Sequence, residues 1–271
     1  MRAWTPPTGP LGRLSSLSGQ RAAASRAATP LEALARAALA VPAPPSFRDA
    51  LVSAEGVAVV AEVKRRSPSK GAINDAIDAG AQVRAYAAGG AVAFSILTEP
   101  SEFGGALDDL RTAAAALARP CIRKDFLVDE IQLAEARLAG AASALLIARA
   151  LPTERLHALV NAAVALGLEP LVEIRDEWEL DDAVAAGARV IGVNNRDLET
   201  LVIDDAVSAR LLPRIPREAI AVYESGVASR ADVERAAAMG ADAVLVGSAL
   251  SAAADPAMAA RALVGVARRP R

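Results

Sequence analysis

Short apolar runs alternate with helical patterns along most of this 271-residue chain. Eight of the runs are too short for a helix and suit strands that are buried on both faces of a parallel sheet. They span residues 57–63, 92–98, 120–124, 143–148, 168–174, 190–194, 219–225 and 242–247. Helical patterns follow them near residues 78–88, 106–117, 129–139, 153–166, 177–186, 204–212, 229–239 and 256–268.

A short phrase recurs where a helical pattern gives way to an apolar run. Gly followed by Ala stands at this point in Gly90-Ala91, Gly140-Ala141, Gly187-Ala188 and Gly240-Ala241. A glycine just after the last helical turn adopts the left-handed cap conformation that other residues resist. The alternation of eight strands and eight helices predicts an α/β fold, a (β/α)8 TIM barrel in a single domain.

A doubly wound open sheet is the alternative to the barrel. Such a sheet usually carries a G-x-G-x-x-G fingerprint after its first strand. Residues 67–71, which follow the first run here, read Ser-Pro-Ser-Lys-Gly and lack that form. The barrel is therefore favoured.

The residues ahead of the first strand form a predicted N-terminal extension. We expect residues 1–50 to be this extension, partly helical, and residues 51–271 to be the barrel domain. A helix is predicted from Leu31 to Leu39, because the prolines of residues 42–45 stop it there. The Ser-, Gly- and Arg-containing stretch of residues 14–24 has only a weak helical signal, and we expect it to be mobile.

Composition and charge restrict the class of protein and its partners. The chain is 53% hydrophobic and 3% aromatic, which predicts a large aliphatic core, and its net charge is -2. With both signs interspersed, no nucleic-acid or membrane partner is expected. No apolar stretch reaches about 18 residues, and residues 1–10 lack the apolar core of a signal peptide. We expect a cytoplasmic monomer, with a homodimer as the alternative.

The rarest side chains limit the chemistry. Cys121 is the only cysteine, so no intrachain disulfide can form and a reducing compartment fits. His157 is the only histidine, and its helical pattern predicts a surface position. Acid–base chemistry must therefore use Lys, Glu or Asp. No cluster of metal ligands is evident, so we expect neither a metal nor another cofactor.

Charged and amide side chains end several of the apolar runs. Burying a charge costs several kcal/mol or more unless it is paired, so repeated charges at strand ends indicate a site. In a barrel of parallel strands these ends converge on one mouth. The residues concerned are Glu62, Lys64, Lys124, Glu173, Asn194, Arg196 and Glu224.

The first strand end carries two of these charges. Glu62 and Lys64 are two residues apart and therefore share one face of their strand. They form either a pair that meets a ligand or a structural ion pair.

Two of the later strand ends suggest an acid and a base. Lys124 stands between Arg123 and Asp125, and a neighbouring cation or partial desolvation would lower its pKa and make it a proton donor. A solvated loop lysine is the alternative. Desolvation would raise the pKa of Glu173 toward that of a general base. An ion pair is its other possible role.

The sixth strand end carries an amide and a guanidinium. Asn194 and Arg196 are two residues apart, so they would be aimed together. The amide can orient a hydroxyl group, and the guanidinium can bind a carboxylate. A plain turn is the alternative.

The last two strands predict a phosphate site. They end in Ser225-Gly226 and Gly247-Ser248, and barrels of this kind often bind phosphate on the loops after strands seven and eight. Residues 248–251 can open a short helix there. The hydroxyls of the loop at residues 67–71, including Ser67, can contribute as well. A phosphorylated small-molecule substrate is therefore expected.

The order and spacing of these residues resemble the indole-3-glycerol phosphate synthase family of tryptophan biosynthesis. The resemblance covers about residues 45 to 260, whereas residues 11–30 are only loosely similar, and Tyr223 stands where a smaller residue is common. The matching segments are Ala61–Gly71, Leu97–Pro100, Phe103–Gly105, Arg123–Phe126, Leu171–Glu173, Gly192–Leu198, Glu224–Gly226 and Val246–Ser248.

The resemblance implies a carboxy-lyase that closes the ring of 1-(2-carboxyphenylamino)-1-deoxyribulose 5-phosphate with loss of CO2 and water. It implies that Lys124 is the general acid and that Glu173 is the base or charge stabiliser. Glu62 and Lys64 would serve dehydration, with Lys64 also near the substrate carboxylate. The remaining implied site residues are Asn194, Arg196, Glu224 and Ser225 around the substrate, Phe103 and Phe126 on its aromatic ring, and Ser67, Gly226, Gly247 and Ser248 on its phosphate.

Two other functions compete with this interpretation. Phosphoribosylanthranilate isomerase is a similar phosphate-binding barrel, but that family relies on a cysteine at its first strand, where this chain has Glu62 and Lys64. A non-catalytic barrel that serves as an assembly partner would have lost some acid–base residues, and none of the matching set is missing.

Overall fold

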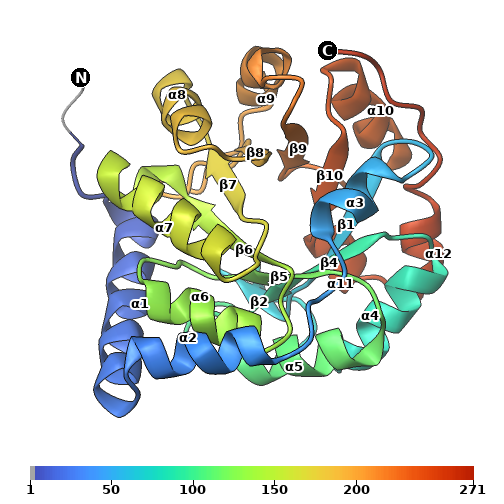
Figure 1. Cartoon of the computed structure of the whole chain (residues 1–271). Coiled ribbons are helices and arrows are strands. Elements are labelled where there is room, and N and C mark those ends of the chain that lie inside the picture. The colour runs from blue at the N-terminus through green and yellow to red at the C-terminus, as the bar shows by residue number, and fades with distance from the viewer. Residues whose placement is uncertain (1–3) are drawn as a thin grey trace.

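Eight parallel strands close into a barrel in the computed structural model, which describes residues 4–271 (Figure 1). Each strand pairs with its neighbours in chain order, and β1 closes the barrel against β4 and β10. The predicted (β/α)8 TIM barrel is therefore confirmed. The barrel strands are β1 (Ala58–Val63), β4 (Ala93–Leu97), β5 (Cys121–Lys124), β6 (Ser143–Ile147), β7 (Leu171–Ile174), β8 (Val190–Asn194), β9 (Ile220–Glu224) and β10 (Ala243–Val246).

Helices surround this barrel and follow its strands. Gly140 and Gly187 have φ values of 88° and 81°, as expected for glycines that end a helix. The surrounding helices are α4 (Ala79–Ala88), α5 (Leu107–Ala116), α6 (Glu130–Leu138), α7 (Thr153–Ala165), α8 (Glu177–Ala185), α9 (Ala206–Leu211), α10 (Arg230–Ala238) and α12 (Pro256–Arg261), with 3-10 turns η1 (Ala148–Ala150) and η2 (Leu212–Arg214).

The last predicted helix is shorter than its pattern indicated. It was expected to reach residue 268, but α12 ends at Arg261. Beyond it the chain buries Leu263 and Val266, and the backbone N–H of Val57 donates to the carbonyl of Val266 at 2.7 Å. The apolar residues of the tail therefore pack beside the start of β1, which a helical continuation would not allow.

Two short pieces of structure follow barrel strands at the mouth. A hairpin of β2 (Arg66–Ser67) and β3 (Gly71–Ala72) lies in the loop after β1 and was not predicted. The two terminal guanidinium nitrogens of Arg65 each donate to Asp109 at 2.7 Å and anchor the start of this loop. The short helix expected after β10 is present as α11 (Ser248–Ser251).

Three helices precede β1, namely α1 (Gly9–Ala28), α2 (Leu31–Ala40) and α3 (Phe47–Val52). The first three residues of the predicted extension lie outside the described residues. Helix α2 matches the helix expected from Leu31, and both α1 and α2 pack against α6 (Figure 1).

The expectation of a mobile segment at residues 14–24 is wrong. Helix α1 is 20 residues long and buries Leu11, Leu14, Ser18 and Ala22, which share one helical face. Ser18 and Ala22 have small side chains, so the sequence of this helix shows only a weak apolar periodicity. The Ser18 hydroxyl accepts a hydrogen bond from Gln132 at 2.7 Å.

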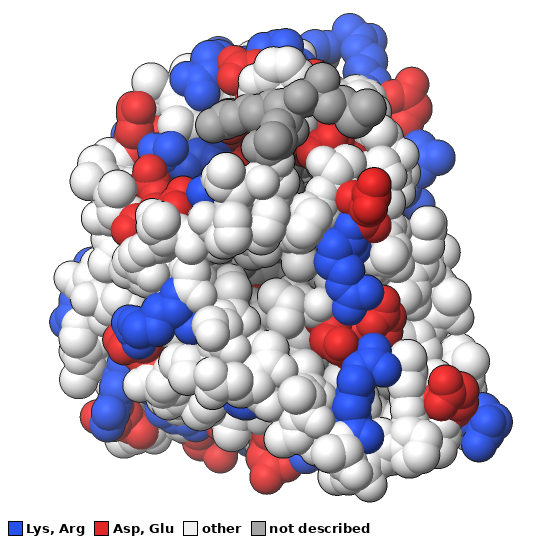
Figure 2. All heavy atoms as spheres, turned by 90° about the vertical axis from the view of Figure 1, so that its left-hand side faces the viewer, with Lys and Arg blue, Asp and Glu red and all other residues white. Residues whose placement is uncertain are grey.

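Ion pairs add to this attachment of α1. Arg21 lies 2.8 Å from Asp125, and Arg26 lies 2.7 Å from Asp129. Figure 2, which views the molecule from the side on which α1 lies in Figure 1, shows positive and negative side chains interspersed over this face.

Helix α3 packs against β1, β4 and β9 just ahead of the first barrel strand. Phe47 and Leu51 are fully buried there, whereas Val52 next to Leu51 is 58% exposed. We predict that Leu51→Ala lowers the free energy of unfolding by about 2–5 kcal/mol, because it leaves a cavity in the core. Urea unfolding followed by circular dichroism measures this loss.

The matched control for Leu51→Ala is Val52→Ala in the same helix. It removes a similar side chain from solvent rather than from the core, so a change within about 0.5 kcal/mol is expected. Equal losses in the two variants would contradict the packing of α3.

Candidate active site

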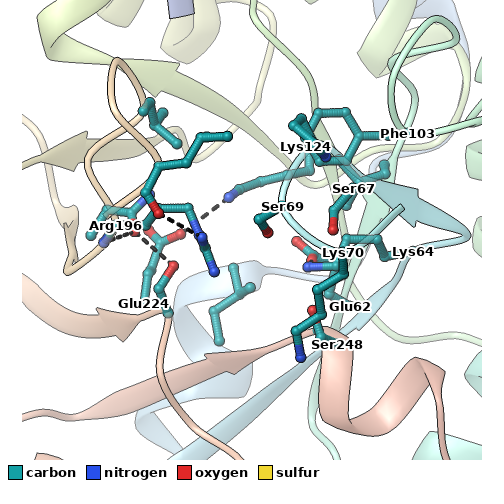
Figure 3. Close-up of a pocket in the computed structure, with 18 of the residues that line it drawn as sticks. Glu62, Lys64, Ser67, Ser69, Lys70, Phe103, Lys124, Arg196, Glu224 and Ser248 are labelled. Atoms are coloured by element: carbon teal, nitrogen blue, oxygen red, sulfur yellow. Dashed lines mark hydrogen bonds and ion pairs between the residues drawn. The ribbon is translucent and has the colours of Figure 1, made fainter. Parts of the chain in front are cut away.

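The carboxyl ends of the barrel strands surround a cavity of about 470 Å³ (Figure 3). All fourteen side chains or glycines that the sequence indicated as site residues line this one cavity. The geometric requirement of the sequence-based hypothesis, that residues far apart in the chain gather around one pocket, is therefore met. They are Glu62, Lys64, Ser67, Phe103, Lys124, Phe126, Glu173, Asn194, Arg196, Glu224, Ser225, Gly226, Gly247 and Ser248.

Strand register explains why these side chains meet. Asn194 of β8 is level with Glu224 of β9, and Glu173 of β7 is level with Ile147 of β6. Alternate residues of a strand point to the same side. Once one residue of a strand points into the barrel, every second residue of that strand does so as well. The inward positions of this layer carry charged or amide groups on β1, β5, β7, β8 and β9.

A cluster of three carboxylates and two ammonium groups occupies the centre of the cavity. The Lys124 Nζ lies 3.4 Å from Glu173 Oε2 and 3.2 Å from Glu224 Oε2. The Lys64 Nζ lies 2.8 Å from Glu62 Oε1. Each buried charge thus has an opposite charge close by, as burial requires. In Figure 3 both lysine side chains extend into the pocket.

The electrostatic surroundings of Lys124 differ from the expectation. Desolvation lowers its pKa, but the negative charges of Glu224, Glu173 and Glu62 outweigh this effect and raise the pKa above its usual value. Its neighbour Arg123 points away from the pocket, because its guanidinium binds Glu135 at 3.0 Å on the helix side of the strand. The predicted lowering of the Lys124 pKa by a neighbouring cation is wrong.

The carboxylates of the cluster are not equivalent. Burial alone would raise the pKa of Glu62, but the charges of Lys64 and Lys124 lower it. Burial raises the pKa of Glu224 to about 8, aided by the charge of Glu173 and opposed by Lys124. A carboxyl group with a raised pKa therefore lies at the end of β9.

Two glycines make room for these carboxylates. A Cβ atom on Gly192 would lie 2.0 Å from Glu224 Oε1, and one on Gly247 would lie 2.2 Å from Glu62 Oε1. Gly247 was expected only as a phosphate-binding residue. Gly192 was missed, and its sole sequence signal was a glycine inside a buried strand.

Hydrogen bonds hold the amide and guanidinium of the site. Asn194 Oδ1 accepts from the Ser225 hydroxyl at 2.8 Å and from the backbone N–H of Arg196 at 2.9 Å. The Arg196 guanidinium donates to the carbonyl of Leu201 at 2.9 Å. Asn194 and Arg196 thus line the same cavity, and the carbonyl of a turn holds the arginine.

The loops after β9, β10 and β1 meet at one end of the cavity, where polar groups are available for an anion. Ser225 and Gly226 have φ values of 66° and 89°, a conformation that glycine tolerates and serine rarely adopts. The Ser67 hydroxyl is buried and has no hydrogen-bond partner among the described residues. Ser69 and Lys70 of the same Ser-Pro-Ser-Lys loop also line the cavity.

Tyr223 braces the loops at this end from outside the barrel. Its hydroxyl donates to Asp205 Oδ1 at 3.3 Å, and its side chain is only 1% exposed. This contact links β9 to the loop before α9.

Apolar side chains form another wall of the cavity. The rings of Phe103 and Phe126 lie with their centroids 6.1 Å apart at an angle of 40°. Pro10 and Leu14 of α1 line the same cavity. The pocket therefore combines a slot for an aromatic ring with a charged centre. The sequence did not indicate that the N-terminal helix contributes to it.

The single histidine and the single cysteine of the chain lie outside the cavity. His157 is half-buried on α7, and Cys121 is buried at the start of β5. Neither lines the cavity.

Comparison with known proteins identifies the family. A family model described as indole-3-glycerol phosphate synthase matches residues 14–263. The chain belongs to the indole-3-glycerol phosphate synthase family. The resemblance drawn from the motifs is confirmed, and with it the enzyme class, a carboxy-lyase of tryptophan biosynthesis. The match to this family also includes most of α1, the part considered only loosely similar.

Individual relatives support the assignment to the indole-3-glycerol phosphate synthase family over almost the whole chain. The indole-3-glycerol phosphate synthase of Mycolicibacterium vanbaalenii is 45% identical over 258 residues, 94% of this chain and 94% of that protein. The one from Opitutus terrae is 50% identical over 222 residues, 80% of this chain and 84% of that protein.

Solved structures of other proteins share only the fold. The 3-hexulose-6-phosphate synthase from Salmonella typhimurium superimposes with a TM-score of 0.62 at 17% identity, covering 76% of this chain and 96% of the other. The N-acetylmannosamine-6-phosphate 2-epimerase from Clostridium perfringens gives a TM-score of 0.57 at 16% identity, covering 73% of this chain and 89% of the other. Within residues 4–271, no helix has the length and apolar character needed to cross a membrane.

The raised pKa of Glu224 predicts a pH-dependent stability. An unfolded glutamate titrates near 4.3, so between about pH 4.5 and pH 8 the folded protein holds a proton that the unfolded chain has lost. The free energy of unfolding should therefore fall as pH rises through this window, by up to about 1.4 kcal/mol per pH unit from this one group. In Glu224→Gln this contribution should be absent, so the variant gains stability relative to the parent protein as pH rises.

Urea unfolding at a series of pH values from 5 to 8.5 measures the difference between parent and Glu224→Gln. The exposed Glu154→Gln change on α7 is the control and should leave the pH profile unaltered. A constant difference between Glu224→Gln and the parent at all pH values would contradict the shifted titration.

Proposed function

We propose that this chain converts 1-(2-carboxyphenylamino)-1-deoxyribulose 5-phosphate to indole-3-glycerol phosphate, with release of CO2 and water. The observation that carries the proposal is the Lys124 ammonium, placed between Glu173 and Glu224 in the cavity. Family membership supports the same reaction. The cavity offers an aromatic slot, a charged centre and an anion-binding end, which suit the three parts of this substrate.

Ring closure would begin with proton donation from Lys124. The ketone oxygen accepts this proton as the aromatic carbon that carries the carboxylate attacks the ketone carbon. Because its pKa is raised, Lys124 is protonated at neutral pH and available as the acid. The intermediate is a cation on the ring nitrogen, and the negative charge of Glu173 stabilises it.

Loss of CO2 and of water would complete the reaction. The carbon–carboxylate bond breaks and its electron pair neutralises the cation. The hydroxyl that formed from the ketone then leaves as water, after a second protonation. At the start, Lys64 is held by Glu62 and lies near the substrate carboxylate. After CO2 has left, Lys64 binds the departing hydroxyl. Glu173 takes a proton from the former methylene carbon next to the nitrogen, and the double bond formed there completes the indole.

The remaining predicted residues would position the substrate. Phe103 and Phe126 pack on the aromatic ring, Asn194, Arg196, Glu224 and Ser225 bind the polar groups of the substrate, and Ser67, Gly226, Gly247 and Ser248 bind the phosphate. The unpartnered hydroxyl of Ser67 supports the phosphate assignment, because a bound anion would satisfy it. A cytoplasmic location and a monomeric state stay predictions.

A direct assay tests the reaction. Purified protein is incubated with the carboxyphenylamino-deoxyribulose phosphate, and indole formation is followed by absorbance and fluorescence. Folded protein that makes no indole product would disprove the proposed function.

Single substitutions test the acid and the base. We predict that Lys124→Ala and Glu173→Gln each lower the single-turnover rate by roughly 100-fold or more, the usual scale for one acid–base group. Binding of indole-3-glycerol phosphate, measured by fluorescence titration, should remain within a few fold because the phosphate and ring contacts persist. Rapid-mixing fluorescence gives the chemical rate.

The exposed Glu154→Gln variant again serves as the control and should keep the full rate. If Lys124→Ala or Glu173→Gln also kept it, the roles given to these two residues would be wrong.

A further inference from the structure

A second cavity of about 240 Å³ adjoins the first and has one wall in common with it. Glu173, Asn194 and Arg196 line both cavities, so Glu173 faces the candidate substrate pocket on one side and this side cavity on the other. The remaining walls of the side cavity come mainly from η1, from the loop between β7 and α8, and from the loop after β8. The polar lining residues are Arg149, Arg175, Asp176, Glu179, Asp197 and Glu199.

Glu179, in the first turn of α8, is the unusual group of this side cavity. Its Oε2 accepts a hydrogen bond from the backbone N–H of Arg175 at 2.6 Å. Burial raises its pKa to about 8, and the charges of Asp176 and Glu173 act in the same direction, whereas the Arg175 hydrogen bond and Arg149 act against them. Glu179 is therefore mostly protonated at neutral pH.

The cations near Glu179 are engaged elsewhere. Arg149 of η1 binds Glu199 at 3.0 Å, and Arg175 binds Asp197 at 3.4 Å. Arg196, on the wall common to both cavities, donates to a backbone carbonyl. No lysine or arginine in residues 4–271 forms an ion pair with Glu179, and the other acidic groups that line the side cavity come from β7, from the turn before α8 and from the loop after β8. A proton on Glu179 is consistent with these surroundings.

The proposed reaction consumes a proton. The ketone oxygen is protonated twice, once when ring closure makes it a hydroxyl and once when that hydroxyl leaves as water. Only one proton is released to the protein, from the carbon next to the nitrogen to Glu173. The substrate carboxylate leaves as neutral CO2, so one further proton must enter from solvent in each turnover. A route that reaches Glu173 from the side cavity would deliver this proton while the bound substrate fills the main cavity.

We propose that the side cavity is the proton entrance and that Glu179 is the relay residue within it. The O–H bond of Glu179 breaks, its proton moves through water in the side cavity to the Glu173 carboxylate, and Glu173 passes it to the neutral amine of Lys124, 3.4 Å away. Solvent then reprotonates Glu179. A cavity of this size has room for several waters and has polar groups to bind them. This inference rests on the proposed function.

Glu179→Gln tests the relay with little change in structure. The glutamine amide keeps the volume and an oxygen that accepts from Arg175, but it cannot release a proton in this role. We expect the single-turnover rate at pH 7 to fall about tenfold, less than the loss of a group that contacts substrate, with KM unchanged. The solvent deuterium isotope effect on that rate should increase. Added imidazolium, a small proton donor that can enter the side cavity, should restore part of the rate.

Two further variants distinguish proton relay by Glu179 from a purely structural role, in which its hydrogen bond to the Arg175 N–H caps the start of α8. Glu177→Gln changes a neighbouring residue of the same helical turn, which binds Arg210 at 2.8 Å on the surface, and should match the parent protein. Glu179→Asp retains a titratable carboxyl group and should retain more of the rate than Glu179→Gln. If Glu179→Gln does not fold, the ranking of Glu179→Asp above Glu179→Ala and the imidazolium rescue of Glu179→Ala provide the same test.

The outcomes distinguish this inference from the proposed function. An unchanged rate and isotope effect in Glu179→Gln, or a loss that imidazolium does not restore, would overturn the relay and leave Glu179 as a cap of α8. If the unaltered protein makes no indole product, the proposed function itself fails.

Discussion

The ammonium group of Lys124, enclosed by carboxylates, is the interaction on which the candidate site depends. An isolated ammonium or carboxylate at this depth would be costly, and each group here is tolerable only because the others lie close. Glu173 and Glu224 contact Lys124, and the charge of Glu62 acts on it as well. The cluster therefore behaves as one electrostatic unit, in which the protonation of each member depends on the others.

The aliphatic barrel is what makes this cluster possible. Parallel pairing brings one inward position of each strand to the same level, and neighbouring apolar layers keep water out. Gly192 and Gly247 leave space that Glu224 and Glu62 occupy. Any side chain on these two residues would push a carboxylate away from its lysine. Backbone shape and electrostatics are thus coupled in this pocket.

The segments around the mouth extend the pocket beyond the barrel. Helix α1 contributes Pro10 and Leu14 to the cavity and binds Asp125, the residue next to Lys124, through Arg21. The loop after β1 is attached to α5 through Arg65 and Asp109. These contacts connect the N-terminal helix and the first loop to the strands that carry the charges.

Most of the fold was predictable from local pattern. Each apolar run of five to seven residues is bounded by a helix end, and glycine caps such as Gly140 mark the boundaries through their backbone preference alone. The end of α12 was not predictable, because the tail beyond it is held by Val57, whose N–H donates to the carbonyl of Val266 from more than two hundred positions earlier in the chain. The packing of α1 was missed for a similar reason, since Ser18 and Ala22 carry little apolar signal by themselves.

The amino-acid sequence by itself determined which chemical groups stand at the strand ends, and hence that Lys and Glu must perform any acid–base chemistry of the site. Only the tertiary structure decided how those groups share their protons. Sequence neighbours suggested that Arg123 would influence Lys124, but strand alternation turns Arg123 outward, and three carboxylates from distant strands determine the pKa of Lys124 instead. A pKa depends on charges within a few ångströms in space, and in a barrel those charges come from strands widely separated along the chain.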